Sequence, residues 1–127
     1  MDVLFRSFQN ALEALKDALK EEKTAITRDA AIQRFEFTAE LSWKCIQKFL
    51  GAEHIICRSL RECLKDAFKF GLVKDDAGWL KIFEDRNLTV HTYSEDIADE
   101  IYGHFGSYIV LFEDLKGNIE KRIALRG

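Results

Sequence analysis

The chain has 127 residues, 47% of them hydrophobic, and its 22 acidic and 19 basic side chains leave a net charge of −3. This length suits one globular domain, which we expect over residues 1–127. The slightly acidic balance excludes a general nucleic-acid binder with a basic surface, although it allows a local basic patch. No apolar run approaches the ~18 residues that a membrane span needs, and the first residues lack the pattern of a secretory signal. We therefore expect a cytoplasmic protein that does not associate with membranes.

Apolar residues recur at helical spacing along the chain, and the sequence contains no proline to interrupt a helix. Steps of three and four predict a first helix over about residues 3–23. A second helix, over about residues 28–50, is apolar over a wide arc and is expected to be central. A third begins with the capping box of Ser59 and Glu62 and ends at Gly71.

The second half of the chain contains a shorter helix and a long one. The shorter helix begins at about Asp76 and leads into a polar segment. Thr92 and Ser94 are both suitable N-caps for a last long helix, whose apolar seam continues to near the C-terminus. Four long helices and one short helix, joined by short loops, predict an all-α fold. The expected architecture is an antiparallel up-and-down four-helix bundle with an additional short helix.

The cysteines and two of the three histidines show no arrangement that indicates a cofactor. Cys45, Cys57 and Cys63 have no metal-ligand spacing, and we expect three reduced thiols. His54 and His104 have no companion ligands in the sequence, so we interpret them as incidental. No metal and no cofactor is predicted.

One short segment carries a permanent cation, an amide, an imidazole and a phenol, contributed by Arg86, Asn87, His91 and Tyr93. A histidine can move a proton near neutral pH, and an arginine can hold a phosphate oxygen. If the segment is helical, Asn87 and His91 share a face, whereas Arg86 points to a neighbouring face. A shared site then needs either a turn near residues 89–91 or a second copy of the chain, and spacing alone leaves both open.

This segment resembles the signature of the HEPN family of small helical bundles. That signature is an arginine, often followed by a polar residue, and then a histidine four to six residues later, which Arg86, Asn87 and His91 match. Tyr93 matches the form found in HEPN toxins that are encoded beside minimal nucleotidyltransferases.

The resemblance extends over roughly residues 5–115. Residues 34–44 (RFEFTAELSWK) are similar to the second-helix segment of the HEPN branch described as nucleotidyltransferase substrate-binding proteins. Residues 84–93 (EDRNLTVHTY) are similar to the signature stretch of that branch.

The resemblance implies a metal-independent endoribonuclease that works as a homodimer. His91 would exchange protons with the ribose 2′-OH or the leaving oxygen, Arg86 would stabilise charge at phosphorus, and Asn87 would order the site. A partner nucleotidyltransferase would silence the nuclease by transferring AMP to Tyr93. The alternative is a non-catalytic subunit that binds a separately encoded nucleotidyltransferase and presents its substrate.

Charged residues around the segment bear on this choice. A basic face of the third helix is suited to follow an RNA backbone or to contact a partner, although a merely solvated face has the same pattern. Its members are Arg58, Arg61, Lys65 and Lys69. Acidic residues flank the signature and would repel RNA; they are Glu84, Asp85, Glu95, Asp96, Asp99 and Glu100.

Purely structural interpretations remain for the signature residues. Arg86 can form a surface ion pair with Glu84, Asp85 or Glu95, an interaction worth little. His91 can be a capping or interface histidine, and the phenol at position 93 can make a hydrogen bond at a dimer interface.

Overall fold

The computed structural model describes residues 2–91 and 94–126. Within these residues the chain forms six α-helices and no strand, so the all-α prediction is confirmed. The helices are α1 (Asp2–Lys20), α2 (Ala25–Ala52), α3 (Leu60–Phe70), α4 (Asp76–His91), α5 (Glu95–Tyr102) and α6 (Phe105–Arg126). Among the described helices, none has an apolar stretch long enough to cross a bilayer.

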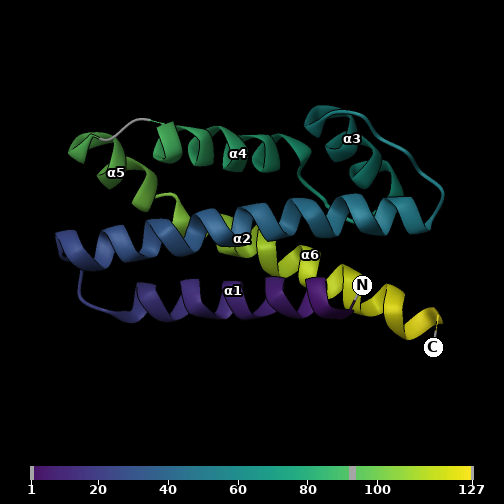
Figure 1. Ribbon diagram of the computed structural model, residues 1–127, viewed down its shortest axis with the longest axis horizontal. Helices are drawn as coiled ribbons and strands as arrows, with labels where there is room; N and C mark the ends of the chain where they lie inside the picture. Colours follow the sequence, from purple (N-terminus) through teal and green to yellow (C-terminus); the bar gives the residue numbers. More distant parts are fainter. Residues whose placement is uncertain (1, 92–93, 127) are drawn as a thin grey trace.

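The longest helix, α2, lies in the middle of the bundle (Figure 1). In that view α1 runs along one side of α2 and α4 along the other, while α6 passes behind and packs against both α1 and α4. The short helices α3 and α5 lie near opposite ends of α4. Helix α4, which carries the signature residues, is therefore flanked by α2, α3, α5 and α6.

Local capping explains several helix boundaries. Thr24 and Thr27 form a reciprocal capping box, so α2 begins three residues earlier than its apolar pattern predicts. Ser59 Oγ accepts a hydrogen bond from the Glu62 N–H at 3.1 Å, which confirms the predicted N-cap of α3. Gly71 ends α3 in the left-handed conformation, with φ of 84°, as expected of a C-terminal glycine.

Large aromatic side chains from the packed helices fill the centre of the bundle. Phe35 of α2 stacks on Phe105 and Tyr108 of α6, with ring centroids 4.7 and 5.7 Å apart. Trp79 of α4 meets Phe112 of α6 edge to face at 5.4 Å. Burying such a side chain stabilises the fold by roughly 1.5–3 kcal/mol, so these contacts fix α4 against α6.

Two helix boundaries differ from the predictions. The helix from Asp76 is not short: it continues to His91, because no glycine or proline follows Gly78 in this stretch. The last long helix is divided into α5 and α6 at Gly103 and His104. The apolar seam did not reveal this break, because Ile101 and Phe105 keep helical spacing across it.

The prediction of three reduced thiols is wrong for two of them. Cys57 and Cys63 form a disulfide, with Cα atoms 5.1 Å apart. Cys57 lies in the loop after α2 and Cys63 lies in the first turn of α3, so the chain reversal between them brings the thiols together. Cys45 is free and buried in α2, and burial raises the pKa of its thiol to about 11.

Candidate functional site

Helix α4 carries three of the predicted site residues, Arg86, Asn87 and His91, in its C-terminal half. The helix is continuous through His91, so the predicted alternative of a turn at residues 89–91 is wrong. Successive helical residues are rotated by about 100°, which places Arg86 and His91 about 140° apart around the axis. One copy of α4 therefore does not bring the two side chains together. Tyr93 lies outside the described residues.

Arg86 is held against α2 rather than by its acidic neighbours in sequence. Its Nη2 lies 3.1 Å from Oε2 of Glu40, and its Nη1 donates to Oδ1 of Asn87 at 3.3 Å. The expected ion pairs with Glu84, Asp85 or Glu95 are replaced by this contact across the bundle. Because the pair is partly exposed it adds little stability, but it orients the guanidinium.

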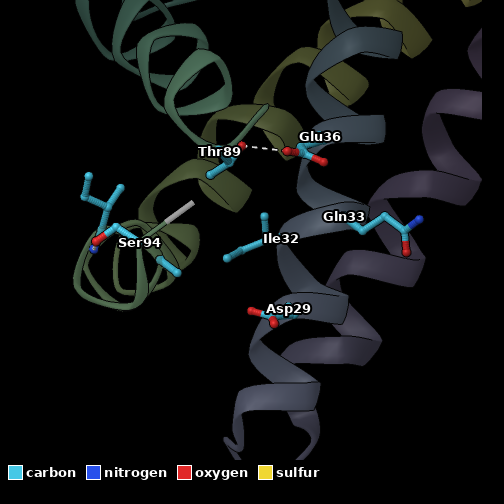
Figure 2. A pocket seen from close by; sticks show the side chains of 8 residues that line it. Asp29, Ile32, Gln33, Glu36, Thr89 and Ser94 are labelled. Carbon is cyan, nitrogen blue, oxygen red and sulfur yellow. Dashed lines mark hydrogen bonds between the residues drawn. The ribbon is translucent and has the colours of Figure 1, made fainter. Parts of the chain in front are cut away.

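A second contact between α2 and α4 lies next to the first. Thr89 donates to Oε2 of Glu36 at 2.7 Å, and its hydroxyl oxygen is 2.9 Å from the carbonyl oxygen of Arg86. Figure 2 shows the bond to Glu36 beside a pocket of about 230 Å³ between α2 and the start of α5. Glu36 and Glu40 are four residues apart, so α2 presents a row of carboxylates to this side of α4.

The other side of the signature is open to solvent. Asn87 and His91 are exposed and share a face, four residues apart. Over the described ranges, the imidazole of His91 has no hydrogen-bond or ion-pair partner. Oδ1 of Asn87 accepts a hydrogen bond from Arg86. In this single chain Asn87 therefore does not provide the expected orientation of the imidazole of His91.

Arg61, Lys65 and Lys69 lie on α3 and are exposed, and α3 begins close to the signature. Arg58 is exposed as well, but it precedes the N-cap Ser59, so its predicted place on this helix is wrong. Leu60, the first residue of α3, lines a small pocket together with Arg86 and Asn87. Arg61 and Lys65 line a neighbouring pocket with the first turns of α4. Glu40 lines the same small pocket as Leu60, so the first turn of α3 lies beside this carboxylate of α2 and next to Arg86.

The interpretation of His104 as incidental is wrong. Its Nδ1 lies 2.8 Å from Oδ2 of Asp85, a carboxylate that is only 3% exposed. Tyr108 donates its O–H to the same oxygen. Burial, together with the hydrogen bond to Asp85, raises the pKa of Tyr108 above its ordinary value, so the phenol stays a donor. This cluster joins α4 to the elbow between α5 and α6.

Sequence reasoning missed Glu40, Glu36 and His104 as neighbours of the signature. Glu40 lies 46 residues before Arg86, and nothing in the local pattern connects them. Asp85 lies on the buried face of its helix, and this position of an acidic residue is the one sequence feature that indicates its role. In the described part of the chain, no group of three or more His, Cys, Asp or Glu side chains is arranged to hold a metal ion.

Comparison with known proteins decides the family. Residues 4–121 match the profile described as nucleotidyltransferase substrate binding protein like. The chain belongs to this family. The resemblance drawn from the second-helix and signature segments is thereby confirmed.

Two similar proteins share most of their length with this chain. The probable ribonuclease HepT of Haemophilus influenzae is 28% identical over 120 residues, which cover 87% of this chain and 82% of that protein. The crystal structure of a Thermus thermophilus protein is 37% identical with a TM-score of 0.79, covering 87% of this chain and 96% of that one.

A third comparison concerns the fold alone. A Haemophilus influenzae structure, described as revealing the fold of a substrate binding domain of a nucleotidyltransferase, superposes with a TM-score of 0.81 at 22% identity. The superposition covers 91% of this chain and 98% of the other. The predicted helical bundle is thus the fold of this relative.

Proposed function

We propose that this chain is the HEPN member of a HEPN/minimal-nucleotidyltransferase pair and a metal-independent endoribonuclease that is inactivated by adenylylation of Tyr93. Family membership and similarity to a protein named as a probable ribonuclease support this proposal. The observation that carries it is the divergence of Arg86 and His91 on one continuous helix. Such a pair completes a site only when a second copy supplies the missing member.

In the proposed homodimer, His91 of one copy faces Arg86 of the other. His91 removes the proton of a ribose 2′-OH, whose oxygen attacks the adjacent phosphorus. The bond from phosphorus to the 5′-oxygen breaks, and the leaving oxygen takes up a proton. The products are a 2′,3′-cyclic phosphate and a 5′-hydroxyl, so no metal or protein nucleophile is required.

Arg86 stabilises the negative charge that develops on the phosphoryl oxygens. A guanidinium has five N–H donors, and Glu40 and Asn87 each contact one of its terminal nitrogens. Its Nε is buried, so only the remaining N–H groups of the two terminal nitrogens stay available to a substrate phosphate, while Glu40 fixes the plane of the group. Asn87 holds the guanidinium from the other side and lies on the same exposed face as His91.

The distribution of charge favours one path for RNA. The carboxylates of Glu36 and Glu40 contact the signature from α2, whereas Arg61 and Lys65 line a pocket with the first turns of α4. We therefore place the RNA backbone along Arg58, Arg61, Lys65 and Lys69, from which it reaches Asn87 and His91.

Adenylylation of Tyr93 is the proposed off-switch. The phenolic oxygen attacks the α-phosphorus of ATP, pyrophosphate leaves, and the phenolic proton is released. The adduct adds a bulky anionic group two residues after His91 in the sequence. It blocks and repels the phosphate of an RNA substrate.

The acidic surroundings of the signature favour a second candidate function. Glu36, Glu40 and the two carboxylates at the start of α5 would repel RNA and attract a basic protein surface. In this alternative the chain is a non-catalytic substrate-binding subunit that forms a complex with a separately encoded nucleotidyltransferase.

An RNA cleavage assay in the presence of a chelator tests the nuclease. We expect wild type to cleave and Arg86→Ala and His91→Ala to lose activity by about two to four orders of magnitude. Arg6→Ala is the matched control, because Arg6 is exposed on α1. If wild type and both signature variants leave RNA intact, the enzyme is excluded and the substrate-binding subunit remains.

Mixing the two inactive variants tests the composite site. A heterodimer of Arg86→Ala and His91→Ala retains one intact Arg86 and one intact His91 on different copies, so we expect activity to return. A site built within each copy would stay inactive in the mixture.

Mass spectrometry after co-expression with the partner nucleotidyltransferase tests the modification. We expect an adenylate on Tyr93 and none on the Tyr93→Phe variant. An adenylate on Tyr102 or Tyr108 instead would overturn the assignment.

A further inference from the structure

A groove of about 590 Å³ lies on the flank of α4 that faces away from Glu40. It is formed by the first turns of α4, the elbow between α5 and α6, and the first turns of α6. Its volume falls within the ~300–1,000 Å³ range of small-molecule sites in proteins. Its polar lining consists of Lys74, Asp75, Lys81, His104, Ser107 and Tyr108. None of these residues belongs to the proposed nuclease site.

His104 is the most firmly positioned group in this groove. The buried carboxylate of Asp85 holds its Nδ1, and that carboxylate is itself fixed by the O–H of Tyr108. A histidine held in this way has a defined ring orientation, and only its second nitrogen, Nε2, remains for a ligand. The side chain of His104 is 31% exposed and lines the groove.

Two lysines, Lys74 and Lys81, supply the positive charges of the groove lining. Lys81 is exposed and, among the described residues, has no ion-pair partner, although Glu84 follows it by one turn. Lys74 is 65% exposed and reaches Asp114 over 3.6 Å, a distance that leaves its ammonium free to turn toward a ligand. The one carboxylate in the lining, Asp75, accepts the N–H of Gly78 at 2.9 Å and so caps α4.

The rest of the lining is apolar or lacks a side chain. Val110 is 58% exposed and lies beside Leu111, while Gly78 and Gly103 contribute no side chain. An exposed valine beside a cationic cluster offers a surface for a flat ring. Two cations, a fixed imidazole and an apolar surface together match a ligand that carries both a phosphate and a ring.

We propose that this groove binds a nucleotide, with its phosphate between Lys74, Lys81 and His104 and its base against Val110 and Leu111. The nucleotide is either free or part of an RNA strand, since both carry the same chemistry. The proposal is independent of cleavage at Arg86 and His91, because it uses neither residue.

Calorimetric titration of the full chain with AMP tests the groove. We expect saturable 1:1 binding per chain, and about five- to tenfold weaker binding for Lys81→Gln, which loses one charge-assisted hydrogen bond. Lys121→Gln is the matched control, because Lys121 is an exposed lysine of α6 outside the groove. Equal weakening by the two variants indicates non-specific charge attraction and overturns the proposal.

Two further measurements test the binding of the base and of the phosphate separately. Val110→Asp places a negative charge on an exposed rim position, so we expect it to abolish AMP binding while the thermal unfolding temperature stays near that of wild type. Inorganic phosphate is expected to bind more weakly than AMP. If phosphate binds as tightly as AMP, or if Val110→Asp binds AMP normally, the base does not lie in the groove and the proposal is wrong.

Competition identifies the source of the nucleotide. A short single-stranded RNA with 2′-O-methyl riboses resists cleavage and serves as the probe. If this RNA displaces AMP from neither wild type nor His91→Ala, the groove takes free nucleotides. If it displaces AMP from wild type but not from His91→Ala, AMP lies at the signature and the proposal is wrong. If it displaces AMP from both proteins, the groove holds a nucleotide of the strand. Absence of AMP binding to wild type overturns the proposal, whatever the outcome of the cleavage assay.

Discussion

The two flanks of α4 bear charged residues that differ in burial: one flank encloses its charge, and the other leaves it partly exposed. On the flank toward α6, Asp85 is buried and receives hydrogen bonds from His104 and Tyr108. On the flank toward α2, Arg86 and Thr89 meet Glu40 and Glu36 at the edge of the solvent. The residues at positions 85 and 86 are adjacent in sequence, yet one is enclosed and the other is partly open.

This difference follows from what each flank can tolerate. A buried carboxylate must be satisfied by fixed donors, since leaving it unpaired is costly. A partly exposed guanidinium keeps water as an alternative partner, so its pairing is weak and exchangeable. The enclosed flank therefore holds α4 in place, and the open flank is suited to exchange Glu40 for a substrate or a partner.

The largest expected effect on stability comes from the enclosed flank. Asp85→Ala removes the shared acceptor of Tyr108 and His104, so we expect the free energy of unfolding to fall by about 2–3 kcal/mol. His91→Ala, at an exposed position, is expected to change it by less than about 0.5 kcal/mol. Urea denaturation measures both. A loss for His91→Ala as large as that for Asp85→Ala would contradict the contrast between the flanks.

A smaller effect is expected from Tyr108→Phe. The ring keeps its stacking on Phe35, and only the O–H to Asp85 is lost. We expect the free energy of unfolding to fall by about 1 kcal/mol. An unchanged stability in urea denaturation would show that the Asp85 carboxylate needs only His104.

Breaking the open flank is expected to cost still less. Glu40→Gln removes the charge opposite Arg86, and we expect the free energy of unfolding to change by less than about 1 kcal/mol. The difference from wild type should shrink as salt is added, because the pair is partly exposed. If the loss of unfolding free energy does not depend on salt, the Arg86–Glu40 pair is shielded from solvent in the same way as Asp85.

The smallest effect concerns pH and the ion pairs that tie α5 to α2. Hydrogen bonds from Arg28 and Lys23 lower the pKa of Asp99 below its ordinary value. Its contribution to stability is therefore present above the unfolded pKa and is lost as the pH falls through the lower, folded pKa. In acid titrations followed by circular dichroism, Asp99→Asn should show a shallower loss of stability below about pH 4 than wild type. Parallel curves for the two proteins would contradict this role.

Much of the fold was predictable from local patterns. Apolar spacing located α1, α2 and α3, and the caps at Ser59 and Gly71 placed the ends of α3 within a residue. The division between α5 and α6 was not predictable, because the apolar seam passes through Gly103 without changing its period. The disulfide was not predicted for a related reason: a separation of six residues in the sequence does not indicate that the chain reverses between them.

The candidate site was predictable only in part. The residue types and spacing of Arg86, Asn87 and His91 indicated their chemistry, and the family match agrees with that resemblance. The partner of Arg86 and the role of His104 were beyond local reasoning. Contacts over 46 and 19 residues arise only when the helices have packed.

The sequence by itself determined that this protein is a helical bundle of a particular family with an arginine, an amide and a histidine on one segment. Helical period, capping and composition are local properties, so a short stretch of residues is enough to identify them. Tertiary structure alone decided that Arg86 turns to Glu40, and that Asp85 and His104 meet. Those outcomes depend on which faces the aromatic core brings together, and a buried charge is stable only where that packing supplies its donors.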